Sequence, residues 1–189
     1  MNYPLDLRFK LMAMLPQVKV SDAAGQVLMY VKEKLALKTA IRIFSDESQQ
    51  KQIYSVAADK AIGLTFTYNI TTPDGAKLGA LKKTGMKSLW KINFPILDAS
   101  GAEVGSIHEE NPWIKVLDGL LSDIPFVGMY INPAYLVVLR GQTVLRVHKQ
   151  PSMMEGKFAV EKKADISEAD EKLLLPAVVM FIMLERFRG

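Results

Sequence analysis

The chain has 189 residues, of which 49% are hydrophobic and 23% are charged, and its formal net charge is +4. This composition excludes a disordered chain, and the length suffices for one hydrophobic core, so we expect residues 1–189 to form a single domain. With no cysteine and only two histidines, the chain can have no disulfide, thiol nucleophile or Cys-based zinc or iron–sulfur site, and a His-rich metal site is not expected.

The N-terminal segment does not have the organisation of a signal peptide. Asp6 and Arg8 precede an apolar stretch of only five residues, 11–15, and no small-residue cleavage site follows it. We therefore expect a cytoplasmic protein.

Most of the chain alternates apolar and polar residues, which is typical of half-buried antiparallel strands. In the segment 64–71, for example, Phe66, Tyr68 and Ile70 share one face, and threonine and asparagine occupy the other. Glycine-containing turns separate the runs. The predicted strands, in chain order, are 9–15, 17–21, 27–33, 38–44, 52–57, 64–71, 76–82, 88–97, 103–109, 135–140, 143–149 and 157–162. About twelve antiparallel strands need a closed barrel or a sandwich, because an open sheet would leave edges that aggregate.

A short amphipathic helix is predicted over 111–122. Asn111 suits the N-cap and Pro112 the first helical position. Behind them, Trp113 begins an apolar stripe at helical spacing, and Pro125 closes the segment.

A second helix is predicted from Ser167 to the C-terminus, with Ser167 and Asp170 forming a variant of the capping box. Its central run, 173–184, is apolar all round. As a helix this run covers ~18 Å against ~30 Å for a bilayer core, and extending it adds six charged residues, so we expect no transmembrane span.

This apolar helix must then be surrounded by protein. Its burial contributes on the order of 20 kcal/mol gross, against ~3 kcal/mol for Pro176, so the proline should kink the helix rather than end it. A barrel of about twelve strands is also wider than its own side chains fill. We therefore predict a mainly β fold: a closed antiparallel barrel that encloses the C-terminal helix.

Two segments carry a resemblance to a known family. Residues 18–22, leading to Gly25 and then 30–32, look like the first hairpin of LURF-one-related proteins, and 75–83 followed by 88–90 looks like their central G-x-x-x-G and basic loop. The chain thus resembles, over nearly its whole length, the tubby C-terminal-like superfamily, which includes the phospholipid scramblases. The resemblance implies the barrel with its central helix. No segment matches the scramblase calcium-binding loop, and the tubby phosphoinositide-binding residues have no residue-by-residue counterparts here.

The basic loop 82–91 is the main candidate binding site. It contains Lys82, Lys83, Lys87 and Lys91 and no acidic residue. Four lysines near an anionic surface contribute about 4 kcal/mol, which is millimolar-grade affinity, so a second anchor is needed. Trp113 could supply it. The alternatives are a solvated loop that keeps the protein soluble and a Trp113 helix that packs against the barrel.

The remaining chemistry favours binding over catalysis. His108 lies near Ser106, Glu109 and Glu110, but no G-x-S-x-G elbow accompanies them, and His108 and His148 are best interpreted as surface histidines. The chain has no P-loop and no dinucleotide fingerprint, so no cofactor is expected. The thinly spread charge argues against nucleic acid.

We therefore expect a non-enzymatic binding module. By family resemblance its partner would be an anionic phospholipid headgroup at a membrane surface, or a phosphorylated small molecule. The alternative is a protein-interaction domain that docks a partner on the 111–122 helix, and an enzyme ranks third.

Overall fold

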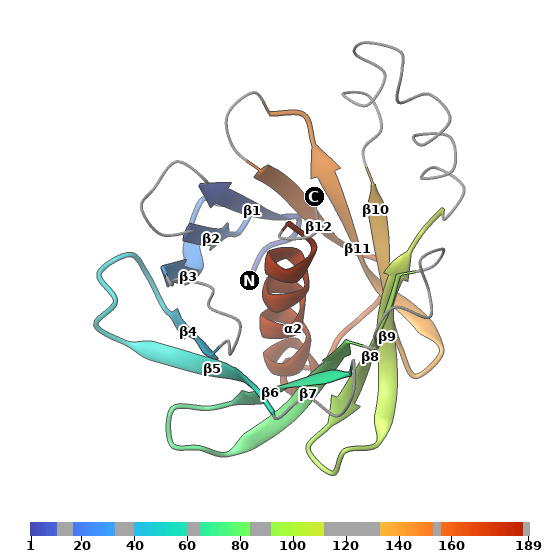
Figure 1. Ribbon diagram of the computed structural model, residues 1–189. Coiled ribbons are helices and arrows are strands. Elements are labelled where there is room, and N and C mark those ends of the chain that lie inside the picture. The colour runs from blue at the N-terminus through green and yellow to red at the C-terminus, as the bar shows by residue number, and fades with distance from the viewer. Residues whose placement is uncertain are drawn as a thin grey trace.

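In the computed structural model, strands form a closed barrel around a single long helix (Figure 1). The structure describes residues 1–10, 17–32, 40–59, 65–83, 92–111, 133–152 and 156–186. Within them, twelve antiparallel strands follow one another around the ring in sequence order, and β12 pairs with β1 to close it. This confirms the predicted barrel and its C-terminal helix. The predicted 111–122 helix lies, apart from Asn111, outside the described residues.

The elements are β1 (Leu5–Lys10), β2 (Gln17–Ser21), β3 (Val27–Lys32), β4 (Ala40–Phe44), β5 (Gln52–Ala58), β6 (Phe66–Thr71), β7 (Lys77–Lys83), β8 (Asn93–Asp98), β9 (Glu103–Glu109), β10 (Ala134–Leu139), β11 (Gln142–Gln150), β12 (Gly156–Lys162) and α2 (Glu168–Arg186).

The first strand corrects the sequence prediction. A strand was expected over 9–15, whereas β1 spans Leu5–Lys10, and residues 11–15 lie outside the described part of the chain. The alternation already begins at Leu5: Leu5, Leu7 and Phe9 are at most 2% exposed and face the core, and charged residues stand between them. Pairing with both β12 and β2 fixes this register.

Helix α2 fills the lumen. All twelve residues from Leu173 to Leu184 are buried, and the helix continues through Pro176 as predicted. Near its C-terminal end the ring of Phe181 meets Phe94 and Tyr135 edge-on, at centroid distances of 5.1 and 4.8 Å. Such pairs contribute specific packing beyond the area that they bury. Among the described helices, none is long and apolar enough to cross a membrane.

The helix lies closest to β7 and also contacts β5, β6 and β8. Gly79 on β7 makes this approach possible, because a Cβ at this position would lie 2.7 Å from Leu173 Cδ1. The wall formed by β12, β1 and β2 lies on the opposite side of the ring.

The start of α2 is fixed by the cap that the sequence predicts. The Asp170 backbone N–H donates to Ser167 Oγ (3.1 Å), and that hydroxyl donates to Asp170 Oδ2 (2.7 Å). Arg140, in the β10–β11 turn, donates two hydrogen bonds to the same carboxylate at 2.9 and 3.1 Å. The helix start is thereby tied to the barrel wall.

This contact makes stability depend on pH. The Arg140 hydrogen bonds lower the pKa of Asp170, so the carboxylate stabilises the fold above its unfolded-state pKa, and this contribution is lost as pH falls through the lower folded pKa. We expect Asp170→Asn to lower the free energy of unfolding by about 1 kcal/mol at pH 7 and by much less near pH 2.5. Urea unfolding at the two pH values measures this. An equal loss at both would show that charge plays no part.

Candidate functional site

The structure describes only part of the predicted basic loop. Lys82 and Lys83 are the last two residues of β7, whereas Lys87, Lys91 and Trp113 lie outside the described residues. Successive side chains of a strand point to opposite faces. Lys83 therefore belongs to the face of β7 that carries Leu81, which is fully buried, and Lys82 belongs to the other face. The two lysines do not form one patch on the barrel wall.

The residues around His108 do not assemble into a catalytic group. Ser106 Oγ lies 3.4 Å from His108 Nδ1 on β9. Alternation turns the next residue, Glu109, toward the barrel interior, where it is 5% exposed. Glu110 forms an ion pair with Arg146 at 2.8 Å. Ser106, His108 and Glu109 therefore do not converge on one side of the sheet.

A network of charges covers the outside of β11 and β12. Arg146 contacts both Glu110 and Glu161, and Lys163 binds Glu161 at 2.6 Å. The hydrogen bond from Lys163 lowers the pKa of Glu161. His148, expected on an exposed strand surface, is 23% exposed, with Nδ1 3.7 Å from Glu161 Oε1. Opposite charges are matched throughout, which is typical of a structural network. Within the described part of the chain, no cluster of His, Asp or Glu could hold a metal ion.

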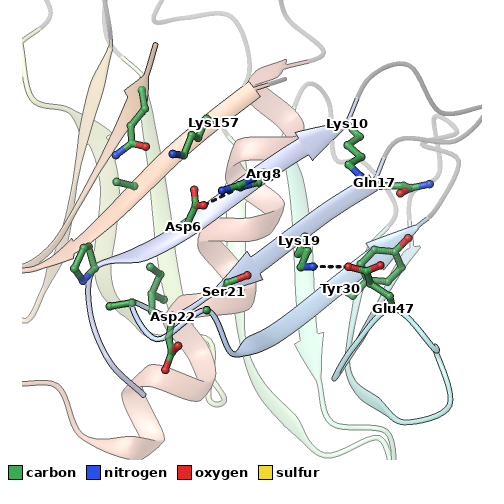
Figure 2. Close-up of a pocket in the computed structure, with 16 residues that line it drawn as sticks. Asp6, Arg8, Lys10, Gln17, Lys19, Ser21, Asp22, Tyr30, Glu47 and Lys157 are labelled. Atoms are coloured by element: carbon green, nitrogen blue, oxygen red, sulfur yellow. Dashed lines mark hydrogen bonds and ion pairs between the residues drawn. The ribbon is translucent and has the colours of Figure 1, made fainter. Parts of the chain in front are cut away.

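Among the described residues, a groove on the outer wall brings several charged side chains together and is a candidate site. It has a volume of about 680 Å³ and extends over β12, β1, β2 and β3, with Glu47 at one edge (Figure 2). Its cationic lining residues are Arg8, Lys10, Lys19 and Lys157, and its acidic ones are Asp6, Asp22 and Glu47.

The register of three strands places the cations in a row. Arg8 on β1 stands directly opposite Lys157 on β12 and directly opposite Lys19 on β2. Neighbouring strands are ~4.8 Å apart, so the row spans about 10 Å. Like charges directly opposite each other destabilise a sheet. The fold therefore maintains this row against electrostatic repulsion, which is a reason to look for an anionic ligand.

Internal carboxylates neutralise the row only in part. Asp6 Oδ2 accepts from Arg8 Nε at 2.9 Å, and Glu47 Oε1 accepts from Lys19 Nζ at 2.5 Å. Among the described residues, no carboxylate lies within ion-pair distance of Lys157. Within the described ranges, one end of the row thus presents a cation with no carboxylate partner.

Asp22 has a structural role in the groove. It is 4% exposed, and its Oδ1 accepts hydrogen bonds from the backbone N–H groups of Ala24 and Gln26, both at 3.0 Å. Its Oδ2 accepts from the Asn2 N–H at 3.3 Å. These bonds build the β2–β3 turn and attach the N-terminal residues to it, so this carboxylate is already satisfied by backbone donors.

Tyr30 on β3 stands opposite Lys19 and forms the far end of the row. Its side chain is covered, with 6% exposure, and burial raises the pKa of its phenol, with the Glu47 charge adding to the effect. The phenol is therefore neutral at physiological pH and adds no anion to the groove.

The sequence does not predict this groove, although Lys19 and Tyr30 lie within the segments 18–22 and 30–32 that carry the family resemblance. Arg8, Lys19 and Lys157 come together only through strand register, and no spacing along the chain signals it. The alternation of Asp6, Arg8 and Lys10 with apolar residues was the one local signal. Comparison with family models, curated proteins and solved structures found no match for the chain. Function must therefore be inferred from the groove itself.

Proposed function

We propose that the protein is a non-enzymatic binding module of tubby-like type whose outer groove takes an anionic, phosphate-bearing ligand. The observation that carries this proposal is the row Lys157–Arg8–Lys19 across three adjacent strands. The same chemistry would recognise the headgroup of an anionic phospholipid or a phosphorylated small molecule.

The residue types in the row suit phosphate. A guanidinium offers paired N–H donors that match two phosphate oxygens, and ammonium groups act as flexible point charges around it. Arg8 occupies the centre of the row with a lysine on each side. A phosphate between Arg8 and Lys157 would contact both cations and relieve the repulsion between them, whereas Lys19 is already paired with Glu47.

The position of the groove separates it from the basic loop. The groove lies on β12–β1–β2, and Lys82 lies on β7, on the other side of the ring. A flat membrane cannot contact opposite walls of one barrel, so the groove and Lys82 cannot form a single membrane-facing surface. They are therefore alternative sites, and the groove is favoured because its cations converge.

Charge reversal distinguishes the two sites. We expect the double variant Arg8→Glu, Lys157→Glu to bind an anionic ligand at least about tenfold more weakly, because two attractive charges become repulsive. Lys82→Glu changes the charge on the opposite wall and should bind as the wild type does. Both variants should keep the wild-type circular dichroism spectrum, since these side chains lie outside the core.

Two probes separate the ligand sources. Titration with inorganic phosphate at low salt measures binding of the free anion, and flotation with phosphatidylserine against phosphatidylcholine vesicles measures binding of the headgroup. Loss of binding in Lys82→Glu, with retention in the groove variant, would move the site to β7. Failure of the wild type to bind phosphate, organic phosphates and anionic vesicles would overturn the proposal.

A further inference from the structure

The Lys19 end of the groove already contains an anion that belongs to the protein. Glu47 lies in the β4–β5 connection, and its side chain reaches past Tyr30 to Lys19 on β2 (Figure 2). The carboxylate oxygen accepts from Lys19 Nζ at 2.5 Å, and this hydrogen bond, with the Lys19 charge, lowers the pKa of Glu47. Glu47 is therefore ionised at neutral pH and occupies the position that a ligand anion would take.

Glu47 is free to leave this position without unfolding its own turn. The neighbouring Asp46 makes the bonds that shape the turn: its carboxylate accepts from Ser45 Oγ and from the Ser48 N–H, both at 2.8 Å. The Glu47 side chain is 57% exposed, and Lys19 is its hydrogen-bond partner. An exposed ion pair of this kind is weak and exchanges readily.

The two ends of the groove therefore differ. At the Lys157 end, the cation has no carboxylate partner among the described residues, so an arriving anion displaces none of their carboxylates from Lys157. At the Lys19 end, an arriving anion must displace Glu47. A ligand with one anionic group is served by Arg8 and Lys157 alone.

From this asymmetry we infer that Glu47 is a tethered competitor for the anion site, and that the groove selects ligands with two anionic groups, one of which displaces Glu47 from Lys19. The inference rests on the proposed function and specifies its ligand class. Inorganic diphosphate belongs to this class, because its outermost oxygens can reach across one strand spacing, about 5 Å, from Arg8 to Lys19. Organic bisphosphates with more widely separated groups belong to it as well.

Glu47→Gln is the direct test. We expect it to raise the ratio of diphosphate affinity to phosphate affinity about twofold to fivefold. The reason is that only diphosphate competes with Glu47 for Lys19. Asp46→Asn is the matched control: it removes the same charge from the same turn, and its amide keeps an oxygen for the Ser48 N–H and an NH₂ group that can donate to Ser45 Oγ. Among the described residues, the ion pair of Lys19 is with Glu47 and not with Asp46. The control should change both affinities alike. Calorimetric titration of each variant with both anions gives the ratios.

Lys19→Gln completes the test. Without the ammonium group, the variant should prefer diphosphate over phosphate less than the wild type does. Adding Glu47→Gln to this variant should then leave the ratio of the two affinities unchanged. If Glu47→Gln and Asp46→Asn shift both affinities equally, Glu47 is not a competitor, and the inference fails while the proposed function stands. If neither anion binds the wild type or Glu47→Gln, the groove is not a phosphate site and both fail.

Discussion

Replacing Phe181 by alanine is expected to lower the free energy of unfolding by about 3–5 kcal/mol, the usual cost of emptying a large buried site. Phe181 is fully buried near the C-terminal end of α2, between Phe94 and Tyr135 on the barrel wall. The two edge-on contacts are lost together with the buried area. Neighbouring strands can collapse into the space only in part, because their register is fixed on both sides.

Urea unfolding followed by circular dichroism measures this loss. Lys172→Ala on the same helix is the control, since Lys172 is exposed and its ion-pair partner among the described residues is Glu168, one turn earlier. The control should unfold at nearly the wild-type urea concentration. If both variants were equally stable, Phe181 would not belong to the core, and the helix would not lie inside the barrel.

The fold could be predicted to this extent because each element is specified locally. In β6, Phe66, Tyr68 and Ile70 alternate with polar residues, and a strand brings all three to one face, where Tyr68 and Ile70 are buried and Phe66 is partly buried. The apolar run of α2 is too short for a bilayer and too apolar for a surface. Both features depend on nearby residues only, so the sequence alone sufficed.

The first strand shows where local patterns mislead. The prediction started at residue 9 because it relied on the apolar run 11–15, whereas β1 already begins at Leu5 and alternates Leu5, Leu7 and Phe9 with charged residues. A strand with one solvated face needs only every second residue to be apolar. The alternation from Leu5 onward therefore indicates where this strand begins better than the apolar run does.

The groove could not be predicted, because it depends on which strands become neighbours. Arg8 meets Lys157 only when the last strand closes onto the first, and a shift of one residue would turn either side chain to the other face. The basic loop, by contrast, is visible in the sequence as a cluster. In the structure its first two lysines diverge across β7. The lysines that cluster in the sequence thus begin on β7, whereas the cations that cluster in space lie on β12, β1 and β2.

Gly79 lies on β7, on the wall opposite the groove. Its replacement by alanine is expected to lower the free energy of unfolding by about 2–5 kcal/mol, from overpacking and backbone strain together. An added Cβ would collide with the carbonyl oxygen of Leu97 on β8 and would lie 2.7 Å from Leu173 Cδ1. Its φ of 157° is also one that residues with side chains rarely adopt. The methyl group therefore forces β7 away from β8, from α2, or from both.

Two further variants separate these causes, with urea unfolding as the measurement throughout. Gly75→Ala, in the β6–β7 turn, has a φ of 91° but no atom within 4 Å of the new Cβ, so it should show backbone strain alone, about 1–2 kcal/mol. Leu173→Ala, combined with Gly79→Ala, removes the helix contact but not the collision with Leu97. The combined loss should then be smaller than the sum of the two single losses. Additive losses of unfolding free energy would mean that α2 does not pack against β7 at Gly79 and that the helix is centred in the barrel.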